Sequence, residues 1–299
     1  MTTRSTINTN HYIGRFAPSP TGELHMGSLV AAVGSYLRAK NHQGQWLVRM
    51  EDLDPLREVK GAADSILRTL EAHGLHWDGE VVYQSQRESL YTHALQQLKN
   101  AGQVYVCTCT RKALMRSAKR GHYGIIYPAT CRKAQHSFEL PKAIRVRTDI
   151  HNETICFHDA YKGKQCQNLE KELGDFIIKR SDGYFAYQLA VVVDDEDQGI
   201  TEVVRGEDLL DNTARQIYLQ KLLGFKQPDY CHLPMVNNEQ GQKLSKQTHA
   251  PALSNSQASA NIIQALRFLG VYNQPIEEVA VENEAPEKIL QWAVENNRL

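Results

Sequence analysis

One segment near the start of the chain combines turn residues with side chains that can contact a phosphate. The stretch PSPTGELHMGS (18–28) lies between a short apolar segment and a longer Ala-, Leu- and Val-rich one. Backbone N–H groups at the start of a helix, together with the helix dipole, favour an anion there. Gly22 and Gly27 allow close approach of a nucleotide, and His25 can donate to a phosphate oxygen. We therefore expect a nucleotide site at His25, Gly27 and Ser28, although this motif alone is also common in ordinary turns.

A second segment, more than 200 residues later, supplies positive charge. The sequence KLSKQ (243–247) contains Lys243 and Lys246. Two lysines on one loop can neutralise the negative charge that develops on a leaving pyrophosphate. A solvated charged loop without a ligand is the alternative for this segment taken alone. The two segments together are a stronger indication of a nucleotide site than either segment alone.

Three of the six cysteines form a local group. Cys107, Cys109 and Cys131 lie close together in the sequence, whereas the other three are scattered, at 156, 166 and 231. Without a secretion signal, such a group is more typical of a metal site than of disulfides, and three buried thiols are the alternative. The scattered cysteines lack metal-like spacing, and we expect them to be core or incidental residues.

The elements that must position these residues alternate between strands and helices. We expect strands at 11–16, 46–50, 81–83, 201–205 and 231–236, and helices at 28–40, 59–73, 88–99, 213–223, 258–269 and 288–295. Strands that alternate with helices at this spacing indicate a parallel α/β sheet. Ligands bind such sheets at the carboxyl ends of the strands, where the loop 18–28 would lie.

Residues 107–170 interrupt this alternation and read as an insertion. They contain the cysteine group, a strongly basic stretch, and strand-like pieces at 143–147 and 154–157. We expect four parts: a first half of the catalytic domain (1–106), the insertion (107–170), a second half (171–240), and the KLSKQ loop with a short helical C-terminal region (241–299).

Composition excludes several classes of protein. The 299 residues carry 34 Lys+Arg and 34 Asp+Glu, and 41% are hydrophobic, which argues against disorder, collagen and coiled coil. No apolar run is long enough for a membrane helix, and the N-terminal ten residues lack the apolar core of a signal peptide. We expect a soluble, cytoplasmic protein without a membrane partner. The segment from Arg111 to Arg147 contains ten basic residues and only one acidic residue. This excess of positive charge indicates either a polyanionic partner or a solvated surface.

The order of HMGS and KLSKQ resembles that of the two signature motifs of class I aminoacyl-tRNA synthetases. Three flanking blocks resemble glutamyl-tRNA synthetases: RFAPSPTG (15–22), RMEDLD (49–54) and VVRGEDLLDNTARQ (203–216). The resemblance implies a Rossmann-type catalytic domain. Ser28 stands where many class I enzymes have a histidine, and small residues also occur there in the glutamate-specific branch.

The resemblance also implies an amino-acid pocket. It places Arg15, Ser19, Glu51, Tyr187 and Arg205 around the substrate. Free glutamate carries two carboxylates and one ammonium, so two arginines and one acid match its charges, and arginine suits carboxylates because it donates two parallel hydrogen bonds. We expect Arg15 to bind the side-chain carboxylate and Glu51 the ammonium. On the sequence alone, a strand aromatic is the alternative for Tyr187 and a surface acid for Glu51.

Only 53 residues follow Lys246, too few for the anticodon-binding domain of a glutamyl-tRNA synthetase. The chain therefore resembles a shortened family, the glutamyl-queuosine tRNA(Asp) synthetases. That family has Cys-x-Cys followed by Tyr-x3-Cys, which implies one structural Zn²⁺ per chain on Cys107, Cys109, Tyr127 and Cys131. His122 and Tyr123 lie in the intervening stretch and are alternative fourth ligands.

The resemblance implies a two-step reaction. ATP with Mg²⁺ and L-glutamate would give glutamyl-adenylate, and a hydroxyl of queuosine in the anticodon loop of tRNA(Asp) would accept the glutamate. Arg15, Ser19, Glu51, Tyr187 and Arg205 would bind glutamate, and the ATP-binding residues would be His25, Gly27, Ser28, Lys243 and Lys246. Of these residues, His25 and Lys246 would be catalytic. The alternatives are a compact synthetase that charges the 3′ end of a tRNA, a small-molecule nucleotidylyltransferase and a non-catalytic tRNA-binding paralogue.

Overall fold

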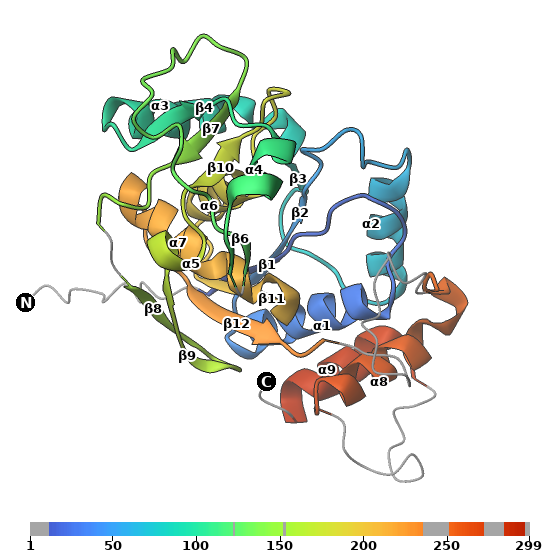
Figure 1. Cartoon of the computed structure of the whole chain (residues 1–299). Coiled ribbons are helices and arrows are strands. Elements are labelled where there is room, and N and C mark those ends of the chain that lie inside the picture. Colours follow the sequence, from blue (N-terminus) through green and yellow to red (C-terminus); the bar gives the residue numbers. More distant parts are fainter. Residues whose placement is uncertain (1–11, 122, 152–153, 236–250, 272–283, 297–299) are drawn as a thin grey trace, which may run out of the picture.

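The computed structural model describes residues 12–121, 123–151, 154–235, 251–271 and 284–296. Figure 1 shows strands with helices packed around them. Among these residues, no helix has the length and apolar character needed to cross a membrane.

The strands next to the predicted nucleotide loop are parallel. Strands β1 (Ile13–Phe16), β2 (Gln45–Met50) and β3 (Val82–Tyr83) form one parallel set. Strands β11 (Glu202–Gly206) and β12 (Asp229–Leu233) form a second. The two sets lie side by side, because the Thr201 N–H donates to the Ile13 carbonyl at 2.9 Å. The carboxyl ends of β1, β2 and β11 therefore meet at one edge.

Helices cross over between these strands, and the first two of them bury the first hydrophobic core. Helix α1 (Met26–Asn41) connects β1 to β2, α2 (Ala62–Ala72) connects β2 to β3, and α7 (Leu210–Leu223) connects β11 to β12. Helices α8 (Ala258–Phe268) and α9 (Pro286–Asn296) pack against α1 in the same core (Figure 1). Gly34 favours the close approach of α1 to β12, since a Cβ there would lie 2.4 Å from Leu233 Cδ1 and the Leu233 side chain would have to shift.

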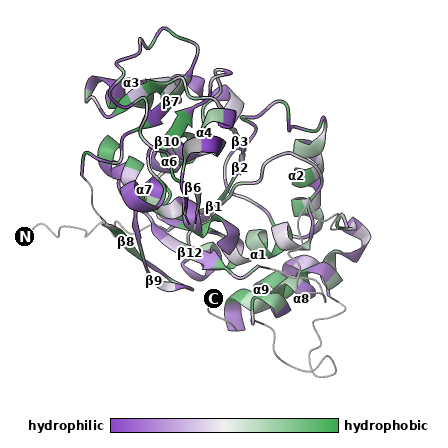
Figure 2. Cartoon of the chain, viewed as in Figure 1, coloured by the Kyte–Doolittle hydropathy of each residue, from purple (hydrophilic) through white to green (hydrophobic). Residues whose placement is uncertain are grey.

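A second, antiparallel sheet supports the other side of the molecule. Its order is β10 (Phe176–Lys179), β7 (Ala143–Val146) and β4 (Val104–Cys107). Helices α3 (Glu88–Asn100) and α6 (Tyr187–Asp197) contribute to its core. Figure 2 shows hydrophobic stretches in β10 and also in α9 of the first core. Helix α6 is buried from Gln188 to Asp195, so its apolar run from Leu189 to Val193 shows no amphipathic pattern.

Strands within residues 107–170 belong both to the antiparallel sheet and to the sheet that contains β12. Strand β7 belongs to the antiparallel sheet, while β8 (Thr154–Asp159) pairs in parallel with β12 and forms a hairpin with β9 (Gly163–Asn168). The same stretch contains short elements around the cysteine group: α4 (Arg111–Ser117), β5 (Arg120–Gly121), β6 (Gly124–Ile125) and, just after β9, α5 (Leu169–Glu172). The 3-10 turns are η1 (Gln84–Gln86), η2 (Glu207–Leu209) and η4 (Asn255–Gln257).

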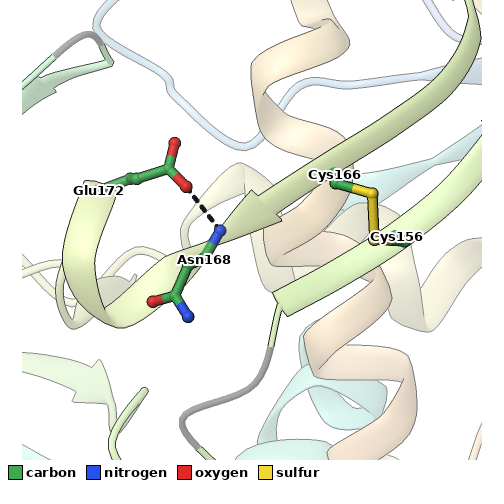
Figure 3. Close-up of a disulfide and its surroundings, with 4 residues drawn as sticks. All are labelled: Cys156, Cys166, Asn168 and Glu172. Carbon is green, nitrogen blue, oxygen red and sulfur yellow. Dashed lines mark hydrogen bonds between the residues drawn. A yellow bond between two sulfur atoms is a disulfide. The ribbon is translucent and has the colours of Figure 1, made fainter.

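The β8–β9 hairpin contains a disulfide that the sequence did not predict. Cys156 and Cys166 are register partners and their sulfurs are bonded (Figure 3). We expected the scattered cysteines to be core or incidental residues; Cys156 and Cys166 are instead exposed and bonded to each other, whereas Cys231 is buried and its thiol is free. At the end of the hairpin, the Asn168 side chain caps α5 by accepting from the Lys171 N–H at 3.0 Å, and the Asn168 N–H donates to Glu172.

Candidate active site

A cavity of about 420 Å³ opens where the predicted site residues converge. It is lined by the loop after β1, the start of α1, the end of β11 and Met235, which follows β12. Eight of the predicted residues line it: Arg15, Ser19, His25, Gly27, Ser28, Glu51, Tyr187 and Arg205. Lys243 and Lys246, predicted to face the ATP phosphates, lie outside the described residues.

His25 forms the N-cap of α1 at the cavity wall. Its backbone is extended, and its Nδ1 accepts a hydrogen bond from the Ser28 N–H at 3.2 Å. In a neutral imidazole the proton then resides on Nε2, which can donate. The first turn of α1 has no acidic side chain, and Arg38 and Lys40 occupy its last turn. The positive end of the helix dipole is thus retained at the cavity, where it favours a phosphate.

Arg15 is held by two hydrogen bonds from its guanidinium to one carboxylate. Its Nε lies 3.0 Å from Asp195 Oδ1 and its Nη2 lies 3.2 Å from Asp195 Oδ2. The same carboxylate binds Arg49 Nη2 at 2.8 Å. Burial opposes ionisation of Asp195, but the two guanidinium groups hold its pKa below the ordinary value. Asp195 therefore compensates two buried arginines and fixes the orientation of Arg15.

Glu51 is a buried carboxyl whose pKa lies near neutral pH. Its side chain is 9% exposed, and its Oε1 lies 3.6 Å from Arg49 Nη2. Burial raises the pKa of Glu51 to about 7, while Arg49 and Arg15 oppose that rise. The Glu51 backbone N–H donates to the Pro18 carbonyl at 2.9 Å. This hydrogen bond joins the end of β2 to the predicted nucleotide loop. An incoming ammonium would favour the ionised form of Glu51.

Arg205 and Tyr187 form the opposite wall of the cavity. Arg205 Nη1 donates to the Tyr187 hydroxyl at 3.2 Å. Burial raises the pKa of Tyr187, so the phenol stays neutral at physiological pH. Tyr187 is the first residue of α6, not a strand aromatic as the sequence alone suggested. Its hydroxyl accepts from Arg205 and retains a proton that can be donated to a substrate.

Among the described residues, the charges around the cavity sum to one positive unit when Glu51 is ionised. The cations are Arg15, Arg49, Arg57 and Arg205, and the anions are Glu51, Asp195 and Asp208. Asp194 does not enter this sum, because Arg87 pairs with it at 2.7 Å. A ligand with two carboxylates and one ammonium has a net charge of minus one. The site therefore complements such a ligand in net charge as well as in the types of its groups.

The three clustered cysteines and a tyrosine converge at one point. The ligand atoms of Cys107, Cys109 and Cys131 all lie within 4.8 Å of one another, with the Cys109 and Cys131 sulfurs 3.5 Å apart. The Tyr127 hydroxyl lies 3.3 Å from the Cys107 sulfur and 3.6 Å from that of Cys109. Two thiolates on one tetrahedral Zn²⁺ would be about 3.8 Å apart, given Zn–S bonds of about 2.3 Å. The donor set therefore fits a tetrahedral metal ion.

Neither of the alternative fourth ligands is seen in this cluster. His122 lies outside the described residues, and Tyr123 packs against the second hydrophobic core. His136, which the sequence did not single out, lies 3.3 Å from the Thr108 hydroxyl, which in turn lies 3.6 Å from the Cys131 sulfur. Thr108 thus separates His136 from the sulfurs.

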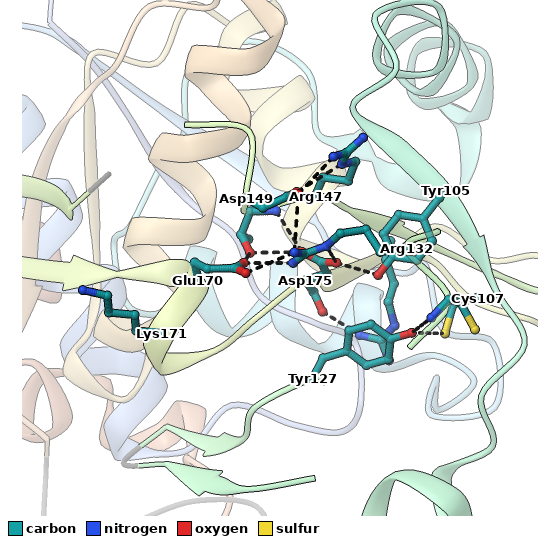
Figure 4. Close-up of polar contacts among 12 residues, drawn as sticks. Tyr105, Cys107, Tyr127, Arg132, Arg147, Asp149, Glu170, Lys171 and Asp175 are labelled. Atoms are coloured by element: carbon teal, nitrogen blue, oxygen red, sulfur yellow. Dashed lines mark hydrogen bonds and ion pairs between the residues drawn. The ribbon is translucent and has the colours of Figure 1, made fainter. Parts of the chain in front are cut away.

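An ion-pair network anchors the cysteine cluster to the body of the protein. Arg132, next to Cys131, binds Asp175 at 2.7 Å and Glu170 at 2.9 Å (Figure 4). The Tyr105 hydroxyl donates to Asp175 at 2.6 Å. Because Asp175 directly precedes β10 and Tyr105 lies in β4, the network joins the cysteine loop to the antiparallel sheet.

Sequence reasoning missed the residues that hold the arginines in place. Asp195 follows a long apolar run, and an acid at the end of a buried helix is a signal that could have identified it. His232 is a lone histidine in a strand of otherwise ordinary composition, and nothing in its surrounding sequence indicates a role. It accepts a hydrogen bond from Arg205 Nε at 3.0 Å.

Comparisons with known proteins show the family of this chain. Residues 13–297 match the family described as tRNA synthetases class I (E and Q), catalytic domain. A protein of Chromobacterium violaceum named glutamyl-Q tRNA(Asp) synthetase is 50% identical over 95% of this chain and 94% of its own length. Proteins of the same name from Dechloromonas aromatica and Thiobacillus denitrificans are 53% and 54% identical, over 95% and 94% of this chain and 93% and 91% of their own lengths.

Solved structures show the same fold at lower identity. A glutamate tRNA ligase from Elizabethkingia meningosepticum, solved with its amino acid, has a TM-score of 0.78 at 23% identity. The match covers 97% of this chain but 65% of that one. A methionyl-tRNA synthetase from Mycobacterium tuberculosis has a TM-score of 0.57 at 10% identity, over 89% of this chain and 64% of that one.

Proposed function

This chain belongs to the class I tRNA synthetases of the E and Q type and, within them, to the glutamyl-Q tRNA(Asp) synthetase family, and we propose that it activates L-glutamate with ATP and transfers it to queuosine in tRNA(Asp). The observation that carries this proposal is identity of 50% or more to proteins of that name across nearly their whole length. The cavity contains groups that suit both glutamate and ATP. Because the reaction needs ATP and tRNA, we assign it to the cytoplasm.

Glutamate binds between the Arg15 and Arg205 walls of the cavity. Arg15 receives the side-chain carboxylate through its remaining N–H groups, while Asp195 holds the other edge of its guanidinium. Glu51 receives the ammonium, and Tyr187 and Arg205 complete the contacts to carboxylate. Ser19 lies in the loop that borders the amino acid.

ATP places its phosphates at the start of α1. His25, Gly27 and Ser28 contact them there, and Lys243 and Lys246 approach from the loop that follows β12. Chain connectivity supports this placement. Met235 lines the cavity and Ala252 pairs with His25, so both flanks of the segment 236–250 lie at the site. Lys246 is six residues from Ala252, a separation that spans at most about 20 Å of extended chain.

The reaction needs positioning and charge stabilisation more than a protein nucleophile. The glutamate α-carboxylate attacks the α-phosphorus of ATP, which forms glutamyl-adenylate and breaks the bond to pyrophosphate. Lys246 and the N-terminus of α1 stabilise charge on the departing pyrophosphate. A queuosine hydroxyl then attacks the activated carbonyl, which gives an ester and releases AMP. Fixing both reactants in one cavity supplies a large share of the acceleration.

Two metal ions have different parts in this proposal. Mg²⁺ enters with ATP and neutralises phosphate charge. Zn²⁺ is structural, held by Cys107, Cys109, Cys131 and Tyr127. A closed tetrahedral site without a water ligand stabilises a fold and does no chemistry.

ATP–pyrophosphate exchange with purified protein tests the activation step. We expect exchange with glutamate and not with glutamine or aspartate, because a neutral amide leaves Arg15 without its ion pair and a shorter side chain does not reach it. We also expect exchange without any RNA. Exchange that appears only after addition of tRNA, or that is equal for glutamine, would contradict the proposal.

A further inference from the structure

A chain of buried polar side chains lies behind Arg205. Arg205 and His232 are register partners on the parallel strands β11 and β12. Arg205 Nε donates to His232 Nε2 at 3.0 Å, and Arg205 Nη2 donates to the Thr213 hydroxyl at 2.8 Å. His232 Nδ1 lies 2.6 Å from Asp159 Oδ2. Arg205 and Tyr187 line the cavity, whereas Asp159, His232 and Thr213 are absent from its described lining.

The donors in this chain fix where each proton resides. A guanidinium can only donate, so His232 Nε2 must be an unprotonated acceptor. The imidazole proton is therefore on Nδ1 and is donated to Asp159. The Asp159 carboxylate is itself held by the N–H groups of Tyr161 and Lys162, at 3.0 and 2.8 Å. Burial, the neighbouring arginines and Asp159 act on the His232 pKa, and the net effect lowers it, so the neutral form persists.

We propose that His232 is a positioning residue for the amino acid: it holds the Arg205 guanidinium in the orientation that receives a substrate carboxylate, and Asp159 fixes the imidazole tautomer that this requires. This inference rests on the proposed function and extends it to a residue that does not touch the substrate. Three of the five N–H groups of Arg205 are engaged by His232, Tyr187 and Thr213, which leaves two terminal N–H groups for a carboxylate. An arginine ordered in advance loses less entropy on binding.

Two amide substitutions separate positioning from general packing. In His232→Gln, the amide oxygen can occupy the place of Nε2 and accept from Arg205. In His232→Asn, the shorter amide can still donate to Asp159 but offers Arg205 no acceptor. We expect His232→Asn to raise the glutamate KM in pyrophosphate exchange by roughly tenfold to a hundredfold, the loss typical of one hydrogen bond to a charged group. The ATP KM and kcat should change little, and His232→Gln should largely restore the glutamate KM.

Controls separate this inference from the proposed function. Cys231→Ala alters the preceding buried residue of β12 and should leave the glutamate KM unchanged. If the parent protein shows no glutamate-dependent exchange, the proposed function fails, and the role of His232 fails with it. If the parent exchanges but the Asn and Gln variants have equal glutamate KM values, only the positioning role is overturned.

A spectroscopic measurement on the unaltered protein tests the same point without a variant. In the ¹⁵N spectrum of histidine-labelled protein, His232 should have a protonated Nδ1 and an unprotonated Nε2. A proton on Nε2 would remove the acceptor for Arg205 and overturn the inference.

Discussion

Arg15 and Asp195 face each other edge to edge, with Nε–Oδ1 and Nη2–Oδ2 separations of 3.0 and 3.2 Å. The two residues are 180 positions apart, on β1 and α6. This contact joins β1 to α6 directly behind the proposed glutamate site. Because Asp195 also binds Arg49, the loss of one carboxylate affects two buried arginines.

Asp195→Asn should therefore destabilise the fold and weaken glutamate binding together. Leaving buried charges without their partner typically costs about 3–5 kcal/mol. We expect a decrease of that size in the free energy of unfolding, measured by urea denaturation at neutral pH. Asp197→Asn is the matched control, because Asp197 also pairs with an arginine but is half exposed, and it should cost about 1 kcal/mol or less. Equal decreases in the free energy of unfolding for the two variants would show that Asp195 does not stabilise the fold more than an exposed ion pair does.

Glutamate affinity should depend on pH through Glu51. The pKa of Glu51 is raised to about 7, so the group is protonated below that pH and ionised above it. Only the ionised form attracts an ammonium, so binding is favoured above pH 7 and lost as the pH falls. The glutamate KM in pyrophosphate exchange should rise by up to about tenfold per pH unit below 7.

The control for this pH dependence is Glu51→Gln, which cannot titrate. This variant should bind glutamate weakly, with a KM that is flat between pH 6 and 8. If the parent KM is equally flat over that range, Glu51 does not bind the ammonium in the way proposed.

Lys246→Ala should damage activation far more than glutamate binding. Lys246 is proposed to meet charge that develops on the leaving pyrophosphate, so its contribution belongs to the transition state. Loss of such a contact typically lowers kcat on the order of a hundredfold to a thousandfold. Arg15→Ala should instead weaken glutamate binding, because Arg15 contacts a carboxylate already present in the ground state.

Glutamate titration alongside pyrophosphate exchange distinguishes these two variants. Lys226→Ala, an exposed lysine in the loop that precedes β12, is the charge-matched control and should exchange like the parent. Near-parental exchange by Lys246→Ala would remove the KLSKQ loop from the catalytic site. Unchanged glutamate affinity in Arg15→Ala would refute the charge argument for glutamate.

Cys109→Ser should release zinc and loosen the region that the cluster organises. A hydroxyl is a poor ligand for Zn²⁺ compared with a thiolate, and structural zinc sites contribute directly to folding energy. Elemental analysis should show a reduced zinc content, and hydrogen exchange should rise around α4 and the residues that follow it. The parallel strands should keep their protection. Cys231→Ala removes a buried thiol outside the cluster and should retain zinc, so equal zinc contents in the two variants would argue against the assignment.

Much of the fold could be predicted from the sequence, because its signals are local. The first expected strand–loop–helix unit, with a strand at 11–16 and a helix at 28–40, matches β1 and α1 within two residues at each end. The α/β class is confirmed. Helix α6 was harder to identify, since a segment buried on all sides carries no helical periodicity. The pairing of β8 with β12 depends on strands some 70 residues apart and has no local signature.

The candidate site likewise combines residues that local motifs identify with residues that only the fold brings together. Motifs identified Arg15, His25, Glu51 and Arg205, and all four line one cavity. The residues that hold the two arginines, Asp195 for Arg15 and His232 for Arg205, are 180 and 27 positions away and become neighbours only in the folded chain. The Cys156–Cys166 disulfide is similar, because the hairpin register, not the spacing of 10 residues, brings the two sulfurs together.

In the proposed reaction, glutamate goes to queuosine and not to the 3′ end of a tRNA. The most direct measurement is transfer of radiolabelled glutamate to tRNA(Asp) with and without queuosine, each prepared both with and without the 3′-terminal adenosine. We expect labelling of the queuosine-containing tRNA whether or not the terminal adenosine is present, and none of the tRNA that has guanosine at the same position. Labelling that requires the terminal adenosine and ignores queuosine would overturn this assignment and identify a conventional, compact synthetase.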